Sequence, residues 1–142
     1  DATTVSAISQ GQPAYRDTGM LYTTANVYGI SAYTPVNMQT DLTAHTVAYT
    51  VTLVNLGNTA DIFDLTIGQH EWETTVSELN PQVIGGGSVD IYVQVNIPAN
   101  ATPHQLDMVT LQWVSRTDPL QTAQVVLTTI SKVGGYLPML LR

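Results

Sequence analysis

The chain has 142 residues, of which 44% are hydrophobic and 11% charged, and its formal net charge is −7. This length and hydrophobic content indicate one folded domain and exclude a disordered acidic chain. Four basic residues against eleven acidic ones exclude nucleic acid as a partner, and the lack of cysteine excludes disulfides and thiolate chemistry.

The composition also bears on location. Charged residues are few, lysine is almost absent, and Thr, Ser, Gln and Asn are abundant, which favours an extracellular or cell-surface protein. The sequence contains neither a signal peptide nor an apolar run of roughly 18 residues. We therefore expect that any export signal has been removed and that the chain does not span a membrane.

Short runs in which hydrophobic and polar residues alternate dominate the chain, which is typical of half-buried β-strands. Turn residues such as Gly57-Asn58, Asn80-Pro81 and Gly85-Gly86-Gly87 separate these runs, and no window has a helical period. The predicted strands are, in chain order, residues 27–33, 46–55, 61–67, 72–76, 89–97, 107–115 and 123–131.

Seven short strands at this spacing predict an all-β fold, an antiparallel sandwich of two sheets over residues 27–131. A small closed barrel is the alternative that fits the same pattern. Trp72 and Trp113 alternate with the hydrophobic set, so we expect both in the core. Outside the sandwich lie a polar N-terminal extension, residues 1–26, with a β-prone stretch at 3–8, and an apolar C-terminal tail, residues 132–142.

Two motifs in the sandwich segment resemble a known family. One has the form N-x-G-N-x-x-D-x-F-D, and the other has the form V-x-V-x-I-P-A-x-A. They are formed by Asn55, Gly57, Asn58, Asp61, Phe63 and Asp64, and by residues 93–101. The segment 27–131 thus resembles the bacterial immunoglobulin-like domains appended to secreted subtilisin-like proteases and glycosidases. The resemblance implies an immunoglobulin-like sandwich and secretion, and it implies no catalytic residues.

Potential metal ligands are few and scattered. His45, His70 and His104 lie in different predicted turns without the close spacing of a zinc site, so we interpret them as turn or surface residues. Asn58, Asp61 and Asp64 could supply oxygen ligands to calcium, but they form only part of the required shell. We expect Asp61 to bond the backbone of the Gly57-Asn58 turn instead. No cofactor is predicted.

The sequence contains no recognisable catalytic motif. It has no G-x-S-x-G, and the three glycines at 85–87 lack the Lys-Ser/Thr of a phosphate-binding loop. Glu71 and Glu73 flank Trp72, so in a strand both carboxylates face away from the core and toward solvent. We therefore expect neither an enzyme nor a binder of small-molecule substrates.

The two terminal segments suggest assembly. The edges of a sandwich are templates for strand addition, and uncovered apolar surface marks interfaces. Residues 1–10 are the predicted donor strand, and the tail contributes further apolar contacts. The candidate self-assembly residues are Thr3, Val5, Ala7, Tyr136, Leu137 and Leu140.

Three functions are compatible with these observations. The first is a non-catalytic, pilus-like filament subunit, a homo-oligomer linked by strand addition. The second is an accessory immunoglobulin-like domain of a larger secreted hydrolase. The third is a carbohydrate-binding module, which would need a row of exposed aromatic residues that the sequence does not display.

Overall fold

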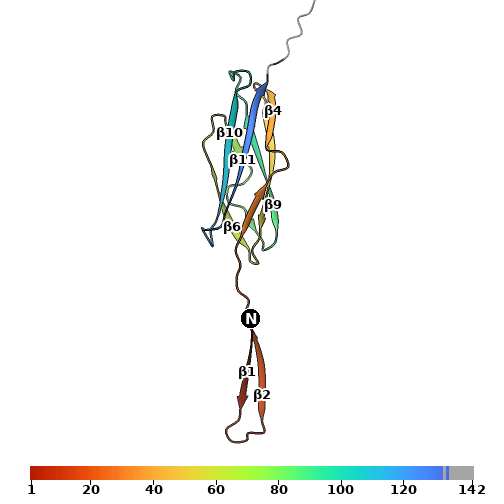
Figure 1. Ribbon diagram of the computed structural model, residues 1–142, viewed down its shortest axis with the longest axis vertical. Coiled ribbons are helices and arrows are strands. Elements are labelled where there is room, and N and C mark those ends of the chain that lie inside the picture. Colours follow the sequence, from red (N-terminus) through yellow and green to blue (C-terminus); the bar gives the residue numbers. More distant parts are fainter. Residues whose placement is uncertain (133, 135–142) are drawn as a thin grey trace, which may run out of the picture.

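The computed structural model describes residues 1–132 and Gly134. Figure 1 shows an elongated β-sandwich and, beyond one of its ends, a separate two-stranded hairpin. The described part of the chain consists of strands and loops, and it has no helix with the length and apolar character of a transmembrane span.

The described part of the chain forms eleven strands, two in the hairpin and nine in the sandwich. β1 (Ala2–Ile8) and β2 (Arg16–Tyr22) form the hairpin. The sandwich contains β3 (Ile30–Tyr33), β4 (Met38–Leu42), β5 (Thr46–Asn55), β6 (Asp61–Ile67), β7 (Thr74–Val76), β8 (Gln82–Val83), β9 (Ser88–Asn96), β10 (Leu106–Ser115) and β11 (Thr122–Lys132).

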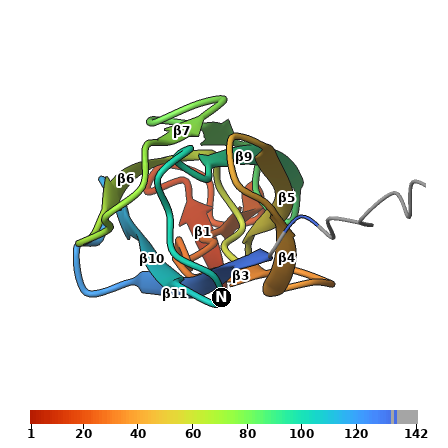
Figure 2. The ribbon, with the colours of Figure 1, turned by 90° about the horizontal axis from the view of Figure 1, so that it is seen from above.

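The sandwich has two layers, which Figure 2 shows facing each other across the core. One sheet has the strand order β4-β11-β10-β6-β8 and the other has the order β3-β5-β9-β7. All pairings described within these sheets are antiparallel except β4 with β11, which is parallel. The predicted all-β immunoglobulin-like sandwich is confirmed, and the alternative of a closed barrel is wrong because two separate sheets face each other.

The core is built by the alternation seen in the sequence. In β5, Val47, Tyr49, Val51 and Leu53 point inward, and in β9 and β10 every second residue does the same. Trp113 is fully buried and Trp72 is 3% exposed, as predicted. Burying a large apolar side chain contributes roughly 1.5–3 kcal/mol, so these alternating positions supply most of the stability of the sandwich.

The structure contains strands that the sequence pattern did not predict, namely β2, β4 and β8. β4 is largely polar, and β8 has two residues, so neither shows a clear hydrophobic period. Their strand conformation comes from backbone pairing with β11 and with β6. The predicted strand at 27–33 begins only at Ile30, and the one at 72–76 begins at Thr74.

A buried asparagine organises the turn between β5 and β6. Asn55 is 1% exposed, and its side-chain amide donates to the carbonyls of Thr59 and Val83, both at 2.9 Å. Its Oδ1 accepts from the N–H of Gly57 at 2.8 Å. Gly57 has to be glycine, because a Cβ there would lie 2.4 Å from the carbonyl oxygen of Val27. The turn is therefore tied to β8 and pressed against residues 27–29.

The substitution Asn55→Ala would leave the carbonyls of Thr59 and Val83 and the N–H of Gly57 without this partner. Because unpaired buried polar groups are costly, we expect a loss of about 2–3 kcal/mol in the free energy of unfolding. Urea denaturation measures this loss. Asn80→Ala, which removes an exposed amide bonded to Asp64, is the control and should change stability by less than about 1 kcal/mol. Equal effects of the two variants would contradict the role assigned to Asn55.

Candidate functional site

The N-terminal hairpin lies outside the sandwich, and every residue of β1 and β2 is exposed. The strands are antiparallel, with Thr3 opposite Leu21, Val5 opposite Gly19 and Ala7 opposite Asp17. Asp1 and Thr23 exchange two backbone hydrogen bonds of 2.8 Å at its open end. The backbone bonds of the hairpin are thus made within the chain, while its side chains have no layer to pack against.

Both faces of the hairpin carry apolar side chains. On one face, Val5 is 48% and Leu21 60% exposed. On the other, Ile8, Met20 and Tyr22 are all more than half exposed. An isolated two-stranded hairpin is at best marginally stable in water, and exposed apolar surface of this kind marks an interface.

The predicted self-assembly residues divide into two groups. Thr3, Val5 and Ala7 share one face of β1, whereas Tyr136, Leu137 and Leu140 lie outside the described residues, as does most of the C-terminal tail. The sequence did not predict β2, which already occupies one edge of the expected donor strand. Donation of this segment to a second chain stays a prediction, and the structure restricts it to the other edge.

The three calcium candidates make separate structural contacts. Asn58 clamps the linker between hairpin and sandwich, since its amide donates to the Ala25 carbonyl and its Oδ1 accepts from the Val27 N–H, each at 2.9 Å. The Asp64 carboxylate holds the Arg116 guanidinium at 2.7 Å, and this bond lowers the pKa of Asp64. Within the described residues, no group of three His, Cys, Asp or Glu side chains is placed to hold a metal ion.

Asp61 does not bond the Gly57-Asn58 turn, so that expectation is wrong; Asn55 fills the role. The Asp61 carboxylate is buried and accepts hydrogen bonds from the hydroxyls of Ser115 and Thr117. Burial raises the pKa of this carboxyl, but these bonds and the N–H of Ile62 outweigh it, and the net pKa lies below the ordinary value of 3.8. The residue therefore ties β6 to the turn after β10 as a charged acceptor.

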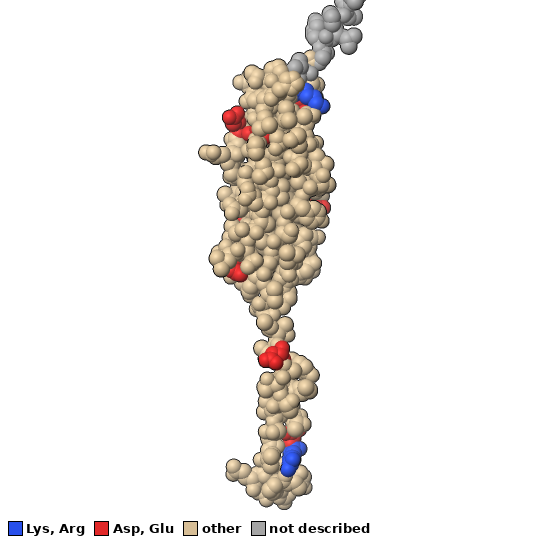
Figure 3. All heavy atoms as spheres, viewed as in Figure 1, with Lys and Arg blue, Asp and Glu red and all other residues tan. Residues whose placement is uncertain are grey.

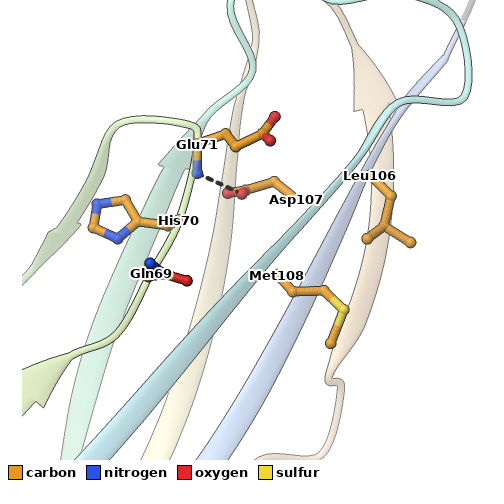
Figure 4. Close-up of a pocket in the computed structure, with 6 residues that line it drawn as sticks. All are labelled: Gln69, His70, Glu71, Leu106, Asp107 and Met108. Atoms are coloured by element: carbon orange, nitrogen blue, oxygen red, sulfur yellow. Dashed lines mark hydrogen bonds between the residues drawn. The ribbon is translucent and has the colours of Figure 1, made fainter.

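A hollow of about 490 Å³ lies between the loop after β6 and the start of β10 (Figure 4). It is lined by Gln69, His70, Glu71, Leu106, Asp107 and Met108. Asp107 is 3% exposed, and its Oδ1 accepts from the Glu71 N–H at 2.8 Å, while its Oδ2 has no protein partner. In Figure 4 the His70 ring points away from Asp107, and its Nδ1 lies 2.7 Å from the Gly68 carbonyl. This arrangement joins the loop after β6 to the start of β10 and offers no nucleophile activated by a base.

The other two histidines lie in separate turns. His45 contacts Asp41 at 3.3 Å, and His104 has a positive φ of 61°. Their places agree with the interpretation of turn or surface residues, and the structure brings neither to the hollow beside Asp107.

Charge is sparse on the broad face of the sandwich that Figure 3 presents, formed by β10, β11 and β4. The side chains that point outward there include Met38, Leu106 and Met108, which are 56%, 47% and 51% exposed. Strand register places Met38, Thr128 and Met108 in one row across the sheet. We call the surface formed by Met38, Leu106, Met108 and Ile130 the outer apolar patch; Ile130 lies between Thr40 and Leu106 in the next row.

No protein-family model matches the chain, and no curated protein matches it. Solved structures do share its fold. A family 123 glycoside hydrolase from Clostridium perfringens aligns over 79% of this chain with a TM-score of 0.59 and 8% identity. A FixG-related protein from Vibrio parahaemolyticus aligns over 75% of this chain and 97% of its own length, with a TM-score of 0.54 and 12% identity.

A PapD-like domain of human CEP192 is similar over 74% of this chain and 87% of its own, with a TM-score of 0.53 and 9% identity. The chain spans only 29% of the length of the glycoside hydrolase. At these identities the comparisons show the β-sandwich fold alone.

The contacts of Asp61 predict a pH dependence. Because its pKa is lower in the folded chain, its charged form stabilises the fold above the ordinary carboxyl range, and this contribution is lost as the pH falls through the folded-state value. Asp61→Asn should therefore cost roughly 1–3 kcal/mol at pH 7, and the cost should shrink on acidification below 3.8.

Urea unfolding of wild type and variant at neutral and acidic pH measures the effect. Asp17→Asn, in the exposed hairpin, is the control and should leave both stability and its pH dependence unchanged. A cost that is the same at both pH values would show that the charge of Asp61 contributes nothing.

Proposed function

We propose that this chain is a non-catalytic structural protein of the bacterial cell surface or extracellular space. In this proposal its copies join into a pilus-like filament, in which the N-terminal hairpin of one subunit adds a strand to the sandwich of the next. The observation that carries the proposal is the hairpin itself, whose two strands are exposed throughout and apolar on both faces.

Strand addition suits this hairpin because each of its strands keeps one free edge. The added main-chain hydrogen bonds would supply affinity, and alternate side chains such as Val5 and Ala7 would set the register. A contact between a hairpin and a different surface of the next copy is heterologous. Such a contact does not close on itself and therefore propagates as a fibre.

The hydrogen bonds of three acidic side chains support a non-catalytic role. Asp61, Asp64 and Asp107 accept hydrogen bonds that join loops and strands. The proposal needs no cofactor, metal or small-molecule substrate. The extracellular location is supported by the low charge and the uncharged polar residues of the sequence.

A second candidate is an accessory immunoglobulin-like domain of a larger secreted hydrolase, either a subtilisin-like protease or a glycosidase. One observation favours it: a similar fold makes up 29% of a glycoside hydrolase chain. In that case the hairpin would pack against another part of the same polypeptide, and the isolated chain would stay monomeric.

Val5→Asp tests the filament proposal. It places a charge on the apolar hairpin face, so we expect fibres of the wild type, seen by electron microscopy, to be lost or to need at least about tenfold more protein. The thermal unfolding of the sandwich should not change, because all its buried hydrophobic residues lie between Val47 and Leu127. Leu120→Asp, at a side chain 88% exposed on a turn of the sandwich, is the matched control.

Removal of residues 1–26 should have the same effect as Val5→Asp. A wild-type chain that remains monomeric at high concentration, by mass in solution, would contradict the filament and favour the accessory domain.

A further inference from the structure

Strand addition needs a free edge on the accepting sandwich, and the described strands offer four. The five-stranded sheet ends in β4 and β8, and the four-stranded sheet ends in β3 and β7. β8 has two residues and β7 three, which is too short to hold a seven-residue strand such as β1 in register. β3 has four residues, three of them half-buried, whereas β4 has five and exposes Met38 and Thr40. β4 is thus the most accessible acceptor.

The backbone of β4 presents unused groups at this edge. The Thr128 N–H donates to the Asn37 carbonyl at 2.8 Å, and β4 runs parallel to β11. In a parallel ladder every second residue bonds the same neighbour, so Asn37, Gln39 and Asp41 face β11. The N–H and C=O groups of Met38 and Thr40 therefore point to the free edge.

The hairpin has a corresponding free edge on β1. Because Asp1 and Thr23 exchange both of their backbone bonds, the alternation of an antiparallel ladder assigns Thr3, Val5 and Ala7 to bonding with β2. The backbone groups of Thr4 and Ser6 then point away from β2.

β1 is also the less protected of the two hairpin edges. Charges and glycine blunt an edge strand against pairing. β2 carries Arg16, Asp17 and Gly19, whereas β1 has the uncharged sequence ATTVSAI.

Side chains around β4 match both faces of the hairpin. A strand added beside β4 extends the row that contains Met38 and Met108 in the outer apolar patch, and the hairpin face with Met20 and Tyr22 would continue this row. The opposite face of the hairpin, which carries Val5, would face the end of β3 and the segment that joins β3 to β4. There Tyr33 and Val36 are 56% and 49% exposed. An edge position thus covers apolar side chains on both faces of the hairpin.

We propose that the free edge of β1 in one copy pairs with the free edge of β4 in a second copy, which extends its five-stranded sheet by the hairpin. This inference rests on the proposed function and names the acceptor that the filament uses. Neither edge is occupied within the described residues of one chain.

Proline substitutions test the two edges separately, because proline removes a backbone N–H that no neighbouring strand of the subunit accepts at these positions. At Thr18 this N–H donates only to the exposed carboxylate of Asp17 in the same strand. Thr4→Pro blocks the donor edge, and Thr18→Pro on the outer edge of β2 is its matched control. Thr40→Pro blocks the acceptor edge. Thr74→Pro on β7 is its control, since the bonds of Glu73 and Ser77 to β9 direct the Thr74 backbone outward.

We expect Thr4→Pro and Thr40→Pro to raise the concentration needed for fibres by about tenfold or more, while Thr18→Pro and Thr74→Pro assemble as the wild type does. Circular dichroism and thermal unfolding verify that each variant is folded. If one proline unfolds the chain, Thr4→Lys and Thr40→Lys repeat the test with a charge in place of the ring.

Mixing the two blocked variants gives the decisive result. A Thr4→Pro chain keeps its acceptor and a Thr40→Pro chain keeps its donor, so the mixture should form one-to-one pairs of twice the chain mass and no fibres. Fibres that survive Thr40→Pro but not Val5→Asp would overturn β4 as acceptor and leave the filament intact. A wild-type chain that never assembles would overturn the filament as well.

Discussion

The turn from Asn55 to Asn58 is the constraint on which the rest of the molecule depends. The Asn55 amide closes the turn on itself and holds the Val83 carbonyl of β8. The Asn58 amide holds the linker at Ala25 and Val27. This one turn therefore holds β8 beside it and fixes the place where the linker to the hairpin leaves the sandwich. Glycine is required at position 57 because a Cβ there would collide with the Val27 carbonyl of that linker.

Much of the sandwich could be predicted because its central strands are half-buried. In β5, β9 and β10 the inward residues are hydrophobic at every second position except for Asn55, Asp107 and Ser115 at strand ends, and this period is visible in the sequence alone. β4 and β8 are edge strands held by backbone hydrogen bonds to neighbours far along the chain. Such pairing leaves no hydrophobic period, so local patterns do not reveal it.

At the hairpin only one of the two strands was predicted, and at Asp61 the predicted partner was wrong. The β-prone stretch around Val5 was predicted, but its partner β2 was not, since Gly19 and the charged pair Arg16-Asp17 weaken the strand signal. Asp61 was assigned to a neighbouring turn because sequence spacing favours local partners. Its actual partner Ser115 lies 54 residues away and becomes adjacent only when β6 pairs with β10.

The parallel pairing of β4 with β11 also has a mechanical consequence. The chain enters the sandwich at the end next to the hairpin, and β11 ends at the opposite end (Figure 1). Tension along the long axis would pull β4 and β11 in opposite directions along their lengths. Because the two strands are parallel, their hydrogen bonds would be sheared together instead of opening one after another. The rate of forced unfolding of a single chain pulled at its hairpin and at the end of β11 would then depend on this five-residue ladder.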